Sequence, residues 1–168
     1  ASAAINLNVG SNTITCEVTA QDNTQKTYTL SITRTAASTN ANLASLVPST
    51  GTLAPAFDSA TITYTLQVPY AVTTMSVTPT VADAFTTLQV NGSSLVSGTA
   101  SSSITLNEGS NVITIVVTAQ NNDTKTYTLT VTREAEAASA TLANLVPNSG
   151  TLSPVFDFAT QTYTLSTT

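Results

Sequence analysis

Apolar and polar residues alternate strictly along several segments of the chain. In 61–68 threonine or glutamine fills every second position, and the apolar residues between them are Ile62, Tyr64, Leu66 and Val68. The same period of two recurs in 75–81, 113–117 and 124–133. Because side chains of a β-strand point alternately to opposite faces, the pattern predicts strands with one buried and one exposed face. No segment shows a convincing helical period.

Turn signals separate these segments. Asn91-Gly92 is a strong type I′ hairpin signal, and Asn107-Glu108-Gly109 marks a second turn. With a short strand at 43–47, about seven strands fit into roughly 92 residues. This spacing predicts an all-β fold, an immunoglobulin-like antiparallel β-sandwich. Pro79, inside 75–81, indicates an edge strand or a strand end.

The chain repeats itself with a period of 99 residues. Shifting the sequence by 99 places aligns ASAAINLNVGSNTIT with ASSSITLNEGSNVIT, and KTYTLSITR with KTYTLTVTR. No gap is needed, and 41 of the 69 overlapping positions are identical. We therefore expect tandem sandwich domains.

The repeat also predicts the domain boundaries. These are the C-terminal third of a preceding repeat at 1–34, a linker at 35–41, a complete repeat at 42–133, a linker at 134–140, and the N-terminal third of a following repeat at 141–168. Isolated thirds of a sandwich expose half a core, so each end is expected to meet its complement outside this chain. Either the chain is a segment of a longer array, which we favour, or neighbouring copies complete one another head to tail.

Two segments resemble a known family. LVPSTGTLAPAFDSATITYTL and ITLNEGSNVITIVVTAQNNDTKTYTLTVTR are similar to the bacterial cadherin-like β-sandwich repeat. The resemblance implies tandem, cadherin-like modules of a secreted or surface-anchored bacterial protein, without catalytic residues. The calcium-ligand motifs of true cadherins, DxD, DRE and DxNDN, do not occur in the sequence, so calcium-stiffened linkers are not expected.

The amino-acid composition argues against some classes of binding partner. Only 8% of residues are charged, against roughly 25% in an average soluble domain, and 36 threonines supply an uncharged polar coat that suits strands. The net charge is −5, with four basic residues, so there is no basic surface for nucleic acid or anionic lipid. No apolar run comes close to the length of about 18 residues that a membrane-spanning helix needs.

Few residues of the chain are candidates for catalysis, metal binding or thiol reactivity. There is no His, and we predict no enzyme, no cofactor and no metal site. Asp58 and its repeat equivalent Asp157 are interpreted as turn caps, with a metal ligand or an acid/base pair as the alternative. The loop at 121–123 is interpreted as a hairpin turn, although it offers calcium ligands. Cys16, equivalent to Ile115, is predicted to be a small core residue, and a reactive or chain-linking thiol is the alternative.

The tyrosines provide the remaining candidates. Four recur with the period and are predicted to lie in the core or in tyrosine corners, with sugar stacking as the alternative: Tyr28, Tyr64, Tyr127 and Tyr163. Tyr70, just after Pro69, breaks this pattern and is the candidate surface contact. Asn91 and Asn122 form N-x-S/T sequons, which matter only in a host that glycosylates them.

The leading hypothesis is a structural and adhesive segment of an extracellular or cell-surface bacterial protein that forms a fibre, stalk or filament. Its partners would be adjacent repeats of the same array or further copies of itself. The alternative is a carbohydrate- or protein-binding accessory module of a larger secreted protein, with surface glycans or proteins as partners. An enzyme is disfavoured, and neither nucleic acid nor a membrane span is expected.

Overall fold

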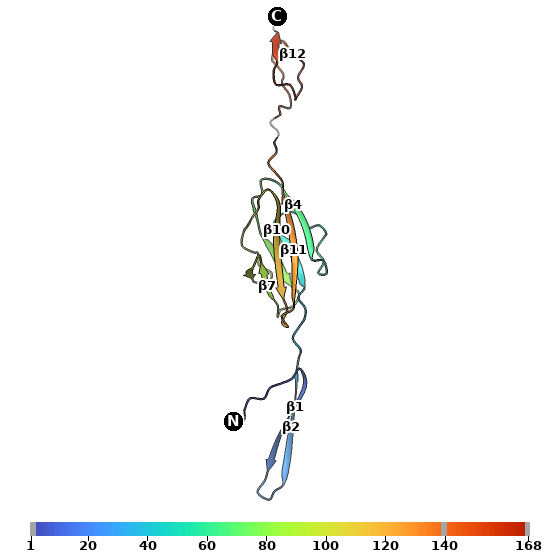
Figure 1. Cartoon of the computed structure of the whole chain (residues 1–168), viewed down its shortest axis with the longest axis vertical. Helices are drawn as coiled ribbons and strands as arrows, with labels where there is room; N and C mark the ends of the chain where they lie inside the picture. Colours follow the sequence, from blue (N-terminus) through green and yellow to red (C-terminus); the bar gives the residue numbers. More distant parts are fainter. Residues whose placement is uncertain (1–2, 139–140, 167–168) are drawn as a thin grey trace. The chain divides into compact units, whose positions relative to one another are not determined.

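Strands, turns and loops make up the chain in its computed structural model, which describes residues 3–138 and 141–166 (Figure 1). The chain divides into two compact units, Ala1–Glu134 and Ala135–Thr168. The first unit contains a β-hairpin and a complete sandwich, and the second contains one short strand pair. The predicted all-β class is confirmed.

The N-terminal hairpin consists of β1 (Gly10–Thr19) and β2 (Gln25–Arg34). They pair antiparallel over all ten positions. At the tip, the amide of Ala20 donates to the carbonyl of Thr24 at 2.8 Å, and Asn23 has a φ of 65°. Asparagine tolerates this left-handed conformation better than most residues, which explains its place in the turn.

The larger sheet of the sandwich has five strands in the order β4-β11-β10-β7-β8 (Figure 1). These strands are β4 (Thr63–Val68), β11 (Thr124–Arg133), β10 (Gly109–Thr118), β7 (Thr87–Val90) and β8 (Ser93–Leu95). β10 and β11 pair over their full length with the same register as β1 and β2. β4 lies along the other edge of β11, parallel to it.

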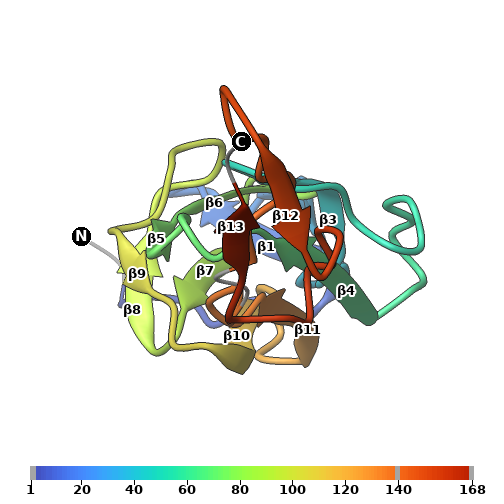
Figure 2. The same ribbon diagram turned by 90° about the horizontal axis from the view of Figure 1, so that it is seen from above.

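Two short strand pairs form the opposite layer of the sandwich. Figure 2 shows β3 and β6 on the side of the sandwich away from β10 and β11. β3 (Leu43–Pro48) pairs antiparallel with β6 (Val77–Val81). β5 (Thr74–Met75) pairs antiparallel with β9 (Ile104–Thr105). The inner faces of the two layers enclose one apolar core, as expected for a sandwich.

The sandwich differs from the prediction in two details. Between Leu43 and Arg133, all of which the structure describes, there are nine strands rather than about seven, partly because Ser76 separates β5 from β6. The β4–β11 pair is parallel, whereas an antiparallel sandwich was predicted. A crossover through the opposite layer separates these two strands in sequence, and this permits a parallel pair. Pro79 lies in β6, whose only strand partner in the described sheets is β3, so the predicted edge-strand position is confirmed.

Burial follows the predicted alternation along β4, β10 and β11. Tyr64, Leu66 and Val68 of β4 are all buried. Ile113, Ile115, Val117, Tyr127, Leu129 and Val131 of the hairpin β10–β11 are fully buried. Ile62 was predicted to join this set, and that prediction is wrong: it precedes β4 and is 47% exposed. Parity alone does not bury a residue that lies beyond the end of the strand.

The predicted turns form with the expected backbone geometry. Asn91 and Gly92, between β7 and β8, have φ values of 48° and 79°, the two positive angles that a type I′ turn requires. Asn122, at the tip between β10 and β11, has a φ of 72°. Both predictions are confirmed, and the loop at 121–123 is a hairpin turn.

The second unit is a reduced copy of the beginning of the sandwich. β12 (Thr151–Ser153) pairs antiparallel with β13 (Thr164–Ser166). The central repeat has the equivalent contact between Ala54 and Thr65 as a single bridge. Local side-chain packing repeats as well: the ring centroids of Phe156 and Tyr163 are 5.9 Å apart, as are those of Phe57 and Tyr64.

Candidate interaction surfaces

Tyr70 follows β4 and is held by the last residue of β11. The guanidinium carbon of Arg133 lies 4.7 Å from the centroid of the Tyr70 ring. Arg133 Nε and Nη2 donate to the carbonyl oxygen of Tyr70 at 2.9 and 2.7 Å. The Tyr70 side chain is 36% exposed, so about two thirds of it is covered by the protein. Since the arginine covers part of its ring, Tyr70 contributes to closing the sandwich edge and offers a small area for stacking.

The carboxylates singled out from the sequence form local turns. Asp58 Oδ1 accepts from the amide of Ala60 at 2.8 Å, and Asp157 Oδ1 accepts from Ala159 at the same distance. The hydroxyl of Tyr64 donates to the carbonyl of Asp58 at 2.5 Å and fixes the same loop. The turn-cap interpretation is therefore confirmed at both positions.

A second cluster ties the entry of the complete repeat to its last strand. Lys125 Nζ donates to Asn42 Oδ1 at 2.8 Å and to the carbonyl of Ser59 at 2.6 Å, and lies 5.1 Å from the ring centroid of Tyr127. The buried hydroxyl of Tyr127 donates to the same Ser59 carbonyl at 2.9 Å and accepts from the amide of Leu43 at 3.1 Å. These bonds join the start of β3, the loop before β4 and the start of β11.

The linker before the complete repeat is bonded to that repeat. Ser38 accepts from the amide of Asn121 at 3.1 Å, and its own amide donates to Gln120 Oε1 at 3.0 Å. The Ser38 hydroxyl donates to the carboxylate of Asp83. This bond, together with one from the amide of Phe85, lowers the pKa of Asp83 below its ordinary value of 3.8.

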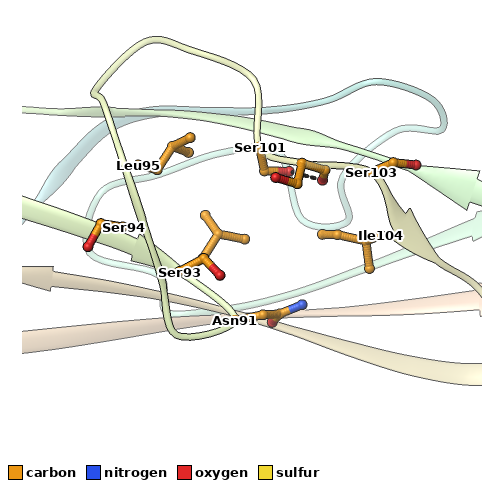
Figure 3. A pocket seen from close by; sticks show the side chains of 9 residues that line it. Asn91, Ser93, Ser94, Leu95, Ser101, Ser103 and Ile104 are labelled. Atoms are coloured by element: carbon orange, nitrogen blue, oxygen red, sulfur yellow. Dashed lines mark hydrogen bonds between the residues drawn. The ribbon is translucent and has the colours of Figure 1, made fainter.

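A cavity of about 230 Å³ lies beside β8 and was not anticipated from the sequence (Figure 3). Its lining is neutral and rich in hydroxyl groups: Val90, Asn91, Ser93, Ser94, Leu95, Ser101, Ser102, Ser103 and Ile104. Ser101 Oγ donates to the Ser102 carbonyl at 3.0 Å and accepts from the amide of Val77 at 3.1 Å. The lining supplies neither an aromatic ring for stacking nor a titratable group for acid/base chemistry.

The N-terminal hairpin leaves its apolar face open. Tyr28 is 54% exposed and Leu30 is 58% exposed, whereas their repeat equivalents Tyr127 and Leu129 are fully buried. Cys16 is also exposed, so the prediction of a core cysteine is wrong for this hairpin. Its equivalent, Ile115, is buried by the second layer of the sandwich, and in this structure no such layer covers the hairpin.

The C-terminal segment, defined as residues 141–166, is open in the same way. Leu165 is 48% exposed, whereas its equivalent Leu66 is 3% exposed. Other apolar side chains of the segment are exposed as well: Leu142, Leu145, Val146, Val155 and Phe158. Each terminal segment therefore exposes side chains whose equivalents are buried in the core of the central sandwich.

Within the described ranges, no group of three or more metal-ligating side chains comes together. The same residues include no helix that is long and apolar enough to cross a bilayer. Every buried side-chain nitrogen or oxygen among them has a hydrogen-bond partner. The polar groups of the central sandwich are thus used to hold it together.

The match to a family model agrees with this geometry. The model of the cadherin-like beta sandwich domain matches residues 1–35 and 39–134, which is most of the chain. The chain belongs to this family. Cadherin-like domains are typically extracellular and typically not catalytic.

The cadherin-like chain is also similar to one individual protein in sequence and to one solved structure. Over 98 residues it is 41% identical to a protein of Evansella cellulosilytica whose name is given as "Putative membrane protein". The alignment spans 58% of this chain but only 15% of that relative. A solved structure of fibronectin(III)-like modules of Clostridium thermocellum CbhA aligns with 82% of this chain and 69% of that chain, at 9% identity and a TM-score of 0.31.

Proposed function

We propose that this chain is a structural and adhesive segment of a secreted or cell-surface bacterial protein that builds an extracellular fibre, stalk or filament. The observation that carries the proposal is where the chain enters and leaves the complete repeat. Asn42, at the entry, bonds to Lys125 at the start of β11. The exit follows Arg133, at the other end of the same strand.

Entry and exit are therefore separated by most of the length of β11. Eight residue steps from Lys125 to Arg133, at about 3.4 Å each, give about 27 Å. When the two termini of a domain lie at opposite ends, each further copy adds to the length of a tandem array. A domain whose termini lie close together would add little to the length of the array.

The strand arrangement suits a segment under tension. β4 and β11 pair in parallel over six residues, from Thr128 opposite Thr63 to Arg133 opposite Val68. Force applied along parallel paired strands loads their hydrogen bonds together instead of one after another. The Lys125 and Tyr127 bonds fasten the entry of the chain to the same strand.

Single-molecule stretching of the 168-residue chain tests load bearing. Handles are attached through cysteines at Thr35 and Ala135, in a Cys16→Ser background. We expect one unfolding event that releases the 92 residues 42–133. At about 3.6 Å per residue these span about 330 Å, so the gain in contour length is about 300 Å after the folded separation of about 27 Å is subtracted.

A matched pair of variants is the control for the stretching experiment. Leu129→Asp places a charge in the core and should abolish the event, whereas Leu30→Asp, at the equivalent exposed position of the hairpin, should leave it unchanged. Smooth extension of the unsubstituted chain at low force, with no unfolding event, would refute load bearing. Immunogold labelling of the producing cells tests the location, and label confined to the cell interior would refute a surface structure.

A further inference from the structure

The cavity beside β8 lies where the two layers of the central sandwich end. Residues 90–95, which include β8, form one wall, and residues 101–104, which reach the start of β9, form the other. Among the strand pairs of the described residues, β8 pairs only with β7, and β9 pairs only with β5. No further strand of this part of the chain closes the side of the sandwich, so a ligand can enter between the two walls.

Polar groups that the fold does not use line both walls. Asn91 Oδ1 accepts from the amide of Thr114 at 2.9 Å, but the side-chain nitrogen of Asn91 has no acceptor among the described residues. Figure 3 shows Asn91 and Ser93 on one side of an open space, and Ser101 and Ser103 on the other. Four of the five lining serines make no side-chain hydrogen bond to another described residue: Ser93, Ser94, Ser102 and Ser103.

Other serines of the sandwich show the contrast. Ser49 Oγ accepts from the amide of Ser76, and Ser97 Oγ accepts from the amide of Val81, both at 3.0 Å. These hydroxyls hold loops to strands, which the four free hydroxyls of the cavity do not do. Their donors and acceptors are therefore available to a ligand.

The repeat shows that two of these hydroxyls are not needed for the fold. Residues 101–104 read SSSI, whereas the equivalent residues 2–5 read SAAI. Ser102 and Ser103 thus replace alanines that the preceding repeat carries at the same positions. The hydroxyl lining is a property of the central repeat and not a requirement of the sandwich.

The lining favours a neutral ligand that has both hydroxyl groups and an apolar face. It contains no charged side chain, so an ionic ligand would lose water without gaining a counter-charge. Val90, Leu95 and Ile104 add apolar surface beside the serines. A sugar ring matches both features, because it carries hydroxyl groups around its rim and C–H groups on its faces.

We infer that this cavity binds one neutral sugar unit of a glycan. Its volume of about 230 Å³ is below the about 300–1,000 Å³ of sites for drug-sized ligands, so it accommodates a single ring while the rest of the glycan stays in solvent. The ring hydroxyls bond to Asn91, Ser102 and Ser103, and a C–H face lies against Ile104. Because no aromatic ring adds stacking, we expect a dissociation constant on the order of 1 mM.

The inference adds a ligand class to the adhesive part of the proposed function and rests on it only there. A fibre or stalk can bear load without binding a glycan. Loss of sugar binding would leave the unfolding event of the stretching experiment unchanged, and loss of that event would leave the sugar site intact. Failure of the site and failure of the proposed function are thus distinguishable.

Chemical-shift mapping on the full 168-residue chain tests the site. Amide signals of the isotope-labelled protein are followed while methyl glycosides of glucose, galactose, mannose and N-acetylglucosamine are added one at a time. We expect at least one glycoside to shift the signals of residues 90–95 and 101–104 with a saturating dose dependence. The methyl glycoside of glucuronic acid, which carries a carboxylate, should bind more weakly than the best neutral glycoside.

Two variants provide the matched comparison. Ser102→Ala combined with Ser103→Ala gives the wall the residues of the preceding repeat, and each lost hydrogen bond should weaken binding by about 2- to 12-fold. Ser110→Ala is the control, because Ser110 is an exposed serine of β10 without a side-chain hydrogen bond to a described residue. It should leave the affinity unchanged, and both variants should unfold at the same temperature as the unsubstituted chain.

Four results would overturn the inference. They are the absence of a saturable shift with all four neutral glycosides, shifts that lie outside residues 90–95 and 101–104, equal affinities of the Ser102/Ser103 and Ser110 variants, and a charged glycoside that binds as tightly as the best neutral one.

Discussion

The hydroxyl of Tyr127 permits a quantitative test of how the sandwich is closed. It accepts from the amide of Leu43 and donates to the carbonyl of Ser59, and both tyrosine and leucine are fully buried. Tyr127→Phe removes only the oxygen, so ring packing and the Lys125 contact over the ring are retained. The Ser59 carbonyl still accepts from Lys125 at 2.6 Å. The substitution therefore leaves one buried donor, the amide of Leu43, without its acceptor.

An unsatisfied buried donor is destabilising by about 1–3 kcal/mol. No cavity penalty is added, since the phenyl ring fills the same space as the phenol. For a domain of about 60–100 residues, each kcal/mol lowers Tm by about 4–8 °C. We therefore expect a decrease of several degrees in Tm and a lower urea midpoint with an unchanged m-value.

The assay is equilibrium urea unfolding followed by far-UV circular dichroism, because the chain contains no tryptophan. Tyr28→Phe is the matched control: it makes the same substitution at the repeat equivalent, which is half exposed, and should leave the midpoint unchanged. A Tyr127→Phe chain that unfolds at the same urea concentration as the Tyr28→Phe chain would refute the assigned role of the hydroxyl.

Two further predictions concern the same sandwich. The pKa of Asp83 is lowered by the bond from Ser38, so its stabilising contribution is present above the ordinary pKa of 3.8 and is lost as the pH falls through the lower folded value. Asp83→Asn should flatten the fall of the urea midpoint at acid pH, and a pH profile parallel to that of the unsubstituted chain would contradict this. Gly51 has a φ of 76°, and an added Cβ would lie 3.1 Å from Leu66 Cδ1, whereas at Gly92 nothing lies within 4 Å. Gly51→Ala should lower Tm more than Gly92→Ala, and equal Tm values would show that the close contact is relieved without cost.

Local patterns predicted the strands and the turns well. Alternation identified the buried faces of β4, β10 and β11 because each strand has one side in the core. Asn91-Gly92 identified its turn because few other residue pairs adopt two consecutive positive φ angles. The repeat predicted that the hairpin β1–β2 would copy β10–β11, and the registers agree at every position.

Features that depend on distant residues were not predictable from these patterns. The cover of Arg133 over Tyr70 joins positions 63 residues apart, and no local signal marks it. The parallel β4–β11 pair joins strands of one sheet that are 65 positions apart, and the serine-lined cavity lies between residues 90–95 and 101–104. Cys16 and Tyr28 have the inward parity of core residues, but burial also requires an opposing layer, which the hairpin lacks in this structure.

From the pairing of β4 with β11 we expect a particular order of folding. β10 and β11 join residues at most 24 positions apart, whereas Thr63 and Thr128 are 65 apart, so the hairpin can form long before the sheet is closed. In a tandem array of near-identical repeats, a newly formed hairpin meets several strands of almost the same sequence. Capture of a strand from the wrong repeat is a characteristic misfolding route of such proteins. We expect sequence differences between copies, such as Ser59 against Phe158, to weaken pairing with a strand of the wrong repeat.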